Sequence, residues 1–186
     1  MPAMTPRAVV LVEGVSDKLA VEALAVRRGR DLAVEHVAVV PMGGSKNIGS
    51  LLAAYGPDGV KLAGLVDVGE EGDFRRALER AGFGDRLTRD EMERLGFYVC
   101  DADLEDELIR ALGPEAVDRV IEELGDLESF RTFQKQPAWR GRPANEQLRR
   151  FFGTTSGRKA RSAPRLVAAL DLDRVPRPLD GVLAHV

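Results

Sequence analysis

The sequence contains one cysteine, Cys100, and only two histidines, His36 and His185, among its 186 residues. One cysteine excludes an internal disulfide, and so few sulfur and imidazole groups exclude a zinc site of the usual kinds. No apolar run approaches the ~20 residues that a membrane-spanning helix needs, so we expect no contact with a membrane. A reducing, cytoplasmic setting is therefore the expected one.

The charge is unevenly distributed, although the net charge of -3 is small. Residues 131–165 hold ten basic side chains and one acidic side chain, Glu146, which gives this segment a charge of +9. The rest of the chain must then carry -12. A basic segment on an acidic body is typical of a surface that contacts nucleic acid, although a solvated basic helix would have the same composition.

Four segments have the apolar, β-branched composition of strands that are buried on both faces. They are residues 8–12, 36–41, 61–66 and 96–100. Helical spacing of apolar residues follows each of them, over 16–28, 46–55, 70–81 and 104–112. Strands that alternate with helices predict an α/β fold with a parallel four-stranded sheet flanked by helices. In such sheets, ligands bind at the carboxyl ends of the strands.

The second half of the chain carries only helical patterns, over 114–124, 127–134, 145–152 and 160–169. We therefore predict three parts: an α/β core over 1–125, a basic helical extension over 126–170 that completes the site, and an extended tail over 171–186. The tail prediction rests on Pro176 and Pro178. The single tryptophan, Trp139, lies in a loop, where it either packs on its own domain or stacks on an unpaired base.

Carboxylates follow three of the four predicted strands. Glu13 comes after the first strand, Asp67 after the third, and Asp101 and Asp103 after the fourth. Asp17 follows Glu13 by four residues, so one helical turn could bring both to the same side. Because Mg²⁺ prefers oxygen ligands, acids at one edge of a sheet predict a site for one or two Mg²⁺ or Mn²⁺ ions. Acids at helix starts also serve as caps, which is the alternative role of Asp17 and Asp103.

These motifs resemble those of the Toprim domain family, above all the Toprim (nuclease) half of OLD (overcoming lysogenization defect) endonucleases. The motifs are Glu13-Gly14-Val15-Ser16-Asp17, Asp67-Val68-Gly69-Glu70-Glu71, Asp103-Leu104-Glu105-Asp106-Glu107-Leu108 and Ser156-Gly157-Arg158-Lys159, within residues 7–170. The resemblance implies a Rossmann-like Toprim fold and metal-dependent cleavage of nucleic acid, with DNA favoured over RNA. It matches Glu13, Asp17, Asp67 and Glu105 to metal ligands and Lys159 to a lysine near the scissile phosphate. Glu13, Asp67 and Lys159 are thus the predicted catalytic residues.

Two departures from the family pattern matter. Gly69 stands where the family has the second acid of an Asp-x-Asp motif. Either Glu70 or Glu71 replaces that acid as a metal ligand, or the second metal binds weakly, or the domain no longer cuts. The sequence also has no Gly-x-x-x-x-Gly-Lys-Ser/Thr motif, so we expect a stand-alone domain, and any ATPase would be a separate partner chain.

Within the basic segment, six residues are the predicted contacts to nucleic acid: Lys135, Arg140, Arg142, Arg158, Lys159 and Arg161. Three alternatives to a DNA nuclease stay open. One is a non-catalytic Toprim module that binds nucleic acid, which the glycine at position 69 favours. Another is a small RNA-processing Toprim nuclease, which suits the size and the basic segment. An enzyme that uses the same metal site on another phosphorylated substrate is a third interpretation.

Overall fold

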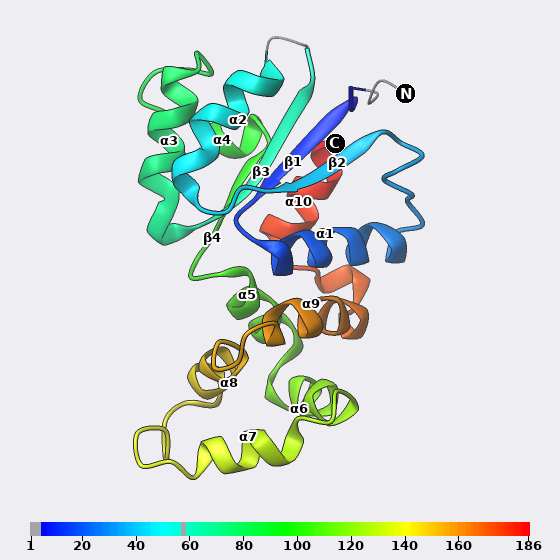
Figure 1. The fold of residues 1–186 in the computed structure, drawn as a ribbon, viewed down its shortest axis with the longest axis vertical. Coiled ribbons are helices and arrows are strands. Elements are labelled where there is room, and N and C mark those ends of the chain that lie inside the picture. Colours follow the sequence, from blue (N-terminus) through cyan, green and yellow to red (C-terminus); the bar gives the residue numbers. More distant parts are fainter. Residues whose placement is uncertain (1–4, 57–58) are drawn as a thin grey trace.

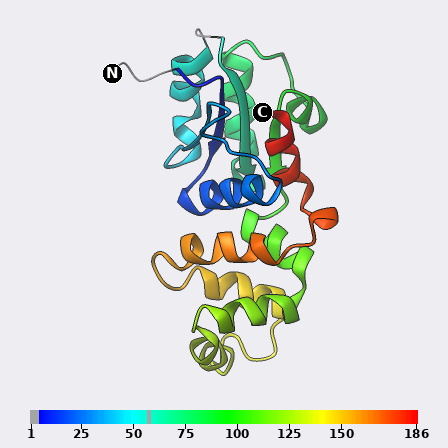
Figure 2. The ribbon, with the colours of Figure 1, turned by 90° about the vertical axis from the view of Figure 1, so that its right-hand side faces the viewer.

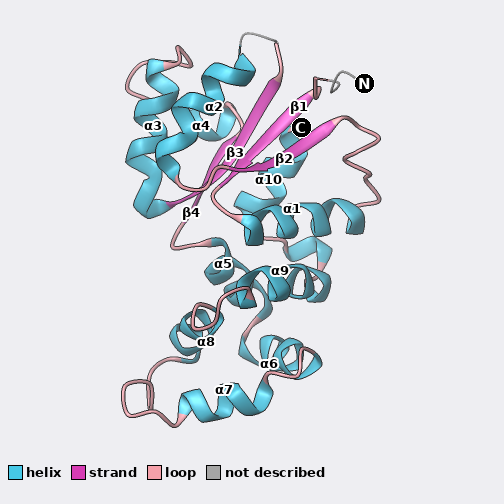
Figure 3. Ribbon diagram, viewed as in Figure 1, coloured by secondary structure: helices cyan, strands magenta, loops and turns pink. Residues whose placement is uncertain are grey.

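The computed structural model describes residues 5–56 and 59–186. These residues form a parallel four-stranded sheet in the order β2-β1-β3-β4 (Figure 3). The strands are β1 (Ala8–Val12), β2 (Val37–Pro41), β3 (Lys61–Asp67) and β4 (Phe97–Cys100). Each strand begins and ends within one residue of its predicted bounds, and the predicted α/β fold with a parallel sheet is confirmed.

Helices cover both faces of the sheet (Figure 1). On one face lie α2 (Ile48–Tyr55), α3 (Glu71–Arg80) and α4 (Arg89–Arg94), and on the other lie α1 (Val15–Arg27) and α10 (Arg177–His185). Because successive strand residues point to opposite faces, Val9 and Leu11 pack with the first group, whereas Val10 and Val12 pack with the second. This double burial explains why the strands are apolar without alternation.

The remaining helices lie beyond the carboxyl ends of the strands. They are α5 (Leu104–Leu112), α6 (Pro114–Glu123), α7 (Leu127–Gln134), α8 (Ala144–Phe152) and α9 (Arg158–Ala169). Figure 2 shows α9 directly beneath α1, with α6, α7 and α8 below α9 and α5 beside it. The Arg27 guanidinium in α1 donates hydrogen bonds to the carbonyls of Val167 at 2.8 Å and Leu170 at 2.7 Å, at the end of α9. These bonds add to the hydrogen bonding of carbonyls at the end of α9, where Val167 also accepts from the Leu170 N–H, and they fix α9 to α1.

The prediction of an extended tail over 171–186 is wrong, because Arg177–His185 form α10, which packs on β3 and β4. Pro176 and Pro178 favour the start of a helix here, since the fixed φ and missing N–H of proline suit a first turn. Leu179, Val182 and Leu183 are buried at helical spacing. The predicted boundary between residues 125 and 126 falls between α6 and α7 and stays a prediction.

In the part of the chain that the structure describes, no helix has both the length and the apolar character needed to span a membrane.

Candidate metal centre

The predicted acids gather where β1 and β3 end and where α1 and α5 begin. Glu13 directly follows β1, and Asp67 is the last residue of β3. Asp17 lies in the first turn of α1, and Glu105 lies in the first turn of α5. These elements meet at the junction between the sheet and the helical half (Figure 1). This is the edge at which ligands bind in parallel α/β sheets.

Glu13 and Asp67 are linked through the backbone. Glu13 Oε1 accepts a hydrogen bond from the Asp67 N–H at 2.7 Å. The bond is possible because β1 and β3 pair in parallel and bring both residues to the same edge. Burial raises the pKa of the Glu13 carboxyl, and this hydrogen bond offsets part of the increase. The two acids are thus held in a fixed relation before any ligand binds.

Asp67 and Asp17 both hold protons more tightly than ordinary aspartates. Burial, followed by the negative charge of Glu13, raises the pKa of Asp67 to about 8. Burial, followed by the charge of Glu105, raises the pKa of Asp17 to about 7. Asp17 Oδ2 also accepts a hydrogen bond from the Gly14 N–H at 2.9 Å. The acids therefore lie close enough to repel one another, and a divalent cation would relieve that repulsion.

Lys159 reaches the acids from the first turn of α9. Its Nζ donates a hydrogen bond to Glu105 Oε2 at 3.0 Å. Glu105 is only 3 % exposed, so Lys159 supplies a hydrogen-bond partner that solvent does not. Burial lowers the pKa of Lys159, but the charge of Glu105 and the hydrogen bond outweigh burial and raise it overall. Lys159 therefore stays positively charged beside the carboxylates.

No group of three or more His, Cys, Asp or Glu side chains in residues 5–56 and 59–186 converges closely enough to hold a metal ion. Glu13, Asp17 and Glu105 instead accept hydrogen bonds from the protein itself. The donor set still fits Mg²⁺ or Mn²⁺, because it consists of carboxylate oxygens, and a cation would lower the raised pKa values of Glu13, Asp17 and Asp67. Glu13, Asp17, Asp67 and Glu105 are the residues that would hold the ion.

Glu70 lies beside this cluster. Its Oε2 accepts a hydrogen bond from the hydroxyl of Ser45, which is buried. The charge of Glu70 contributes to the raised pKa of Glu13, so the two carboxylates are neighbours. Glu70 is therefore a candidate for the acid that Gly69 does not provide.

Glu71 is held by arginines instead, which corrects its prediction as a metal ligand. One oxygen accepts a hydrogen bond from Arg89 and the other from Arg75. The hydrogen bond from Arg89 contributes most to a lowered pKa for Glu71. A carboxylate that is neutralised by two guanidinium groups has no unsatisfied charge to offer a cation.

The basic residues predicted to contact nucleic acid differ in their accessibility. Lys135, Arg140, Arg142 and Arg161 are exposed, and Lys159 is partly buried. Arg158 is 8 % exposed, lies over the Phe151 ring at 4.0 Å from its centroid and donates to the Phe151 carbonyl at 3.0 Å. The prediction for Arg158 is therefore corrected, because its guanidinium is part of the core. Trp139 packs on its own domain and stacks on Phe133 with ring centroids 5.2 Å apart.

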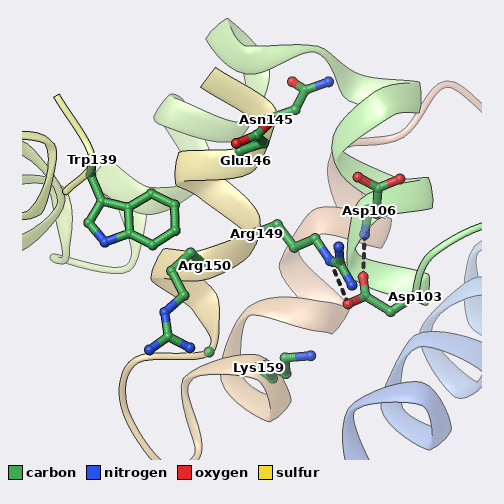
Figure 4. A pocket seen from close by; sticks show the side chains of 9 residues that line it. Asp103, Asp106, Trp139, Asn145, Glu146, Arg149, Arg150 and Lys159 are labelled. Atoms are coloured by element: carbon green, nitrogen blue, oxygen red, sulfur yellow. Dashed lines mark hydrogen bonds and ion pairs between the residues drawn. The ribbon is translucent and has the colours of Figure 1, made fainter. Parts of the chain in front are cut away.

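Sequence reasoning missed Arg149 and Arg150, which follow one another on α8. Arg149 Nε donates a hydrogen bond to Asp103 Oδ2 at 2.8 Å, and Asp103 Oδ1 caps α5 through the Asp106 N–H at 2.8 Å. Both arginines line a hollow of about 570 Å³ next to Lys159 (Figure 4). The consecutive arginines within the basic segment were the available signal, but only the fold places them beside the acids.

Comparison with known proteins agrees with this geometry. Residues 6–68 match the sequence model of a family described as overcoming lysogenization defect protein-like, TOPRIM domain. None of the curated proteins matches this chain.

Among solved structures, the chain is similar to the C-terminal region of the OLD protein of Burkholderia pseudomallei, with a TM-score of 0.74 and 21% identity over 98% of this chain and 97% of that one. It is also similar to the C-terminal region of the OLD protein of Xanthomonas campestris pv. campestris, with a TM-score of 0.71 and 26% identity over 98% and 95% of the two chains. Residues 6–68 thus carry the OLD-like Toprim sequence pattern, and the chain has the fold of an OLD C-terminal region over nearly its whole length.

Proposed function

We propose that the protein is a nuclease that depends on Mg²⁺ or Mn²⁺ and cleaves phosphodiester bonds, with DNA as the favoured substrate. The observation that supports it most is the meeting of four acids and one lysine, from β1, β3, α1, α5 and α9, at the carboxyl edge of the sheet. Acids that raise one another's pKa in a stable protein cost free energy, and a metal-dependent activity accounts for their presence.

A divalent cation, when bound, would supply Lewis acidity at the scissile phosphate. Glu13, Asp17 and Asp67 are proposed to hold one ion, and Glu105 with Glu70 to help hold a second. Within the chain, the Asp67 N–H orients the Glu13 carboxylate. Lys159 lies at the same place with a positive charge, and it would stabilise the negative charge that develops on the phosphoryl oxygens.

The basic surface would supply the affinity for the substrate backbone. Lys135, Arg140, Arg142 and Arg161 are exposed on the helical half and can approach phosphates. Binding of this kind weakens steeply as the salt concentration rises. A separate ATPase chain and a cytoplasmic setting stay predictions.

The test is a cleavage assay on supercoiled plasmid with EDTA, Mg²⁺ or Mn²⁺. We expect nicking that requires a metal, that Glu13→Ala abolishes, and that the matched variant Glu115→Ala retains, since Glu115 is exposed on α6 away from the cluster. The same assay on a structured RNA separates a DNA nuclease from an RNA-processing one.

The same experiment tests the non-catalytic alternative, which Gly69 favours. Plasmid binding that is sensitive to salt, without cleavage in any metal, would replace the nuclease by a binding module. Cleavage by Glu13→Ala at the wild-type rate would show that the reaction occurs elsewhere.

A further inference from the structure

Two neighbouring hollows lie on the helical half, each with a volume of about 570 Å³. The first adjoins the acidic cluster, because Asp103 and Lys159 line it. The second lies among α7, α8 and the loop before α9, where Ser129, Thr132 and Thr155 line it. Trp139 and Arg150 line both hollows, so together they form one path that leads away from the candidate metal centre.

Arg150 is the cation at the point where the hollows meet. Its side chain is exposed, and among the described residues it has no hydrogen-bond or ion-pair partner. Its neighbour Arg149, by contrast, is paired with Asp103. An arginine that is unpaired at the centre of a concave surface is suited to bind an anion, and its planar donors match a phosphate.

The second hollow offers neutral donors of hydrogen bonds, beside the buried Arg158 and the exposed Glu128, which also line it. The hydroxyls of Ser129, Thr132 and Thr155 are exposed and have no partner among the described residues. Hydroxyl groups of this kind contact the sugar-phosphate backbone in nucleic-acid complexes. The first hollow adds carboxylates as acceptors for base edges, since Asp106 and Glu146 line it, where Arg110 and Arg142 pair with them. Figure 4 shows Asp106, Glu146 and Arg150 among the residues that line the first hollow.

Trp139 lines both hollows. One face of its indole ring is stacked on Phe133, and the Arg142 guanidinium lies 5.7 Å from the ring centroid. The ring is therefore fixed before a ligand binds, and it contributes apolar surface without an ordering cost. As the only tryptophan, it also reports on both hollows through its fluorescence.

We propose that the two hollows bind one unpaired strand of nucleic acid, with a phosphate at Arg150, as it leaves the cleavage site. The proposal rests on the proposed nuclease function for its ligand class. Concave spaces of this size admit single nucleotides with their bases turned inward, whereas the bases of a duplex are stacked and paired and cannot enter. The protein would therefore prefer substrates that have an unpaired strand beside the scissile bond.

The test follows Trp139 fluorescence while the protein, in EDTA, is titrated with an oligothymidylate of about 12 nucleotides. An oligouridylate of the same length and a blunt duplex serve as further probes. We expect both single strands to change the emission and the duplex to change it only at much higher concentration. Arg150→Gln should weaken binding about fivefold or more, and it should reduce the slope of log K against log salt by about 0.7.

The matched control is Arg119→Gln, which removes the same charge from an exposed position on α6 outside both hollows. It should bind within about twofold of the wild type. Two results would contradict the proposed path. One is that Arg150→Gln binds the single strands as tightly as this control, and the other is that saturation with a single strand leaves the Trp139 emission unchanged. If the duplex binds as well as the single strands, the preference for an unpaired strand is wrong.

The outcome is separable from that of the plasmid assay. If the protein cleaves plasmid but Arg150→Gln binds single strands as tightly as the wild type, the proposed binding path is wrong and the nuclease proposal stands. Binding that requires Arg150, combined with no cleavage in any metal, would overturn the nuclease proposal and leave the path standing.

Discussion

Lys159 Nζ lies 3.0 Å from Glu105 Oε2, and the two ends of this ion pair differ in their access to solvent. The side chain of Glu105 is 4% exposed, whereas that of Lys159 is 40% exposed. Lys159 can therefore turn toward a substrate, but Glu105 cannot leave the interior. The pair joins α9 to α5, so it contributes to stability as well as to the proposed chemistry, and mutations can separate the two roles.

Lys159→Met should abolish cleavage and lower the free energy of unfolding by about 1–2 kcal/mol, because it leaves a buried carboxylate without a partner. The double variant Lys159→Met/Glu105→Gln should recover most of that stability, since the glutamine is neutral, and should still not cleave. Denaturation by urea and the plasmid assay give the two readouts. A double variant that cleaves would show that Lys159 acts only as the structural partner of Glu105.

Asp67→Asn should stabilise the protein in EDTA while abolishing cleavage. The pKa of Asp67 is raised from 3.8 to about 8, first by burial and then by neighbouring acids. An acid with a higher pKa in the folded state opposes folding as the pH rises above its unfolded pKa, and the cost is complete above its folded pKa. The gain should therefore be absent at about pH 4 and on the order of 1 kcal/mol or more at about pH 9.

Thermal unfolding over this pH range checks the prediction. Asp85→Asn is the matched control, because Asp85 lies in a loop with its side chain 90% exposed. It should not change stability at either pH. If Asp67→Asn destabilised the metal-free protein at high pH, Asp67 would be a structural residue rather than a candidate ligand.

The sequence was sufficient to predict the parts of the fold that depend on local patterns. The four strands follow from apolar runs, and Glu13 and Asp67 follow them directly. Two helices were missed for local reasons. α4 is short, and its only sequence signal is the capping pair Thr88 and Glu91. α10 begins at prolines, which also favour an extended chain.

The site residues could not all be predicted, because their partners come from distant segments. Glu71 is neutralised by Arg89, which lies 18 residues away in the sequence. Arg158 is buried by its contact with Phe151 and its ion pair with Asp126. The sequence of a basic segment gives its charge, but it does not show which guanidinium groups are already paired within the protein.

Metal binding should release protons and strengthen as the pH rises from about 6 to 8. The pKa of Asp17 is about 7 and that of Asp67 is about 8, so both carboxylates lose their protons progressively over this range, and a cation displaces the protons that remain. Affinity for Mn²⁺ should increase by up to about tenfold per pH unit for each proton released. Calorimetry in two buffers with different ionisation enthalpies measures the number of protons. An affinity that is independent of pH would mean that these two acids do not bind the ion.

Arg158→Gln should reduce stability and Arg161→Gln should reduce DNA binding, although both arginines bind Asp126 Oδ2. Arg158 is buried and also bonds the Phe151 carbonyl, so its loss should lower the free energy of unfolding by about 2 kcal/mol and change the salt dependence of DNA binding less than the loss of Arg161 does, although Arg158 lines the second hollow. The side chain of Arg161 is 57% exposed, so its loss should weaken DNA binding with little change in stability. Equal effects of the two variants on the salt slope would contradict this assignment.

Gly69→Asp should strengthen metal binding, because it restores the second acid of the family motif next to Asp67. A Cβ at position 69 would meet no atom within 4 Å, so the backbone has room for a side chain. An added carboxylate raises the charge of the donor set, and we expect the Mg²⁺ concentration for half-maximal cleavage to fall about threefold to tenfold. The variant should also be less stable in EDTA, since the new charge adds to the existing repulsion.

Gly69→Asn separates the charge from the size of the new side chain, because asparagine has nearly the same shape as aspartate. If the carboxylate binds the ion, only Gly69→Asp should lower the Mg²⁺ requirement, and Mg²⁺ should raise the melting temperature of that variant more than that of the wild type. If both substitutions have the same effect on the Mg²⁺ requirement, we infer that Glu70 already serves as the second acid and that Gly69 does not weaken the metal site. In that case Glu70→Gln should weaken metal binding in the wild type, where the carboxylate of Glu70 lies beside Glu13.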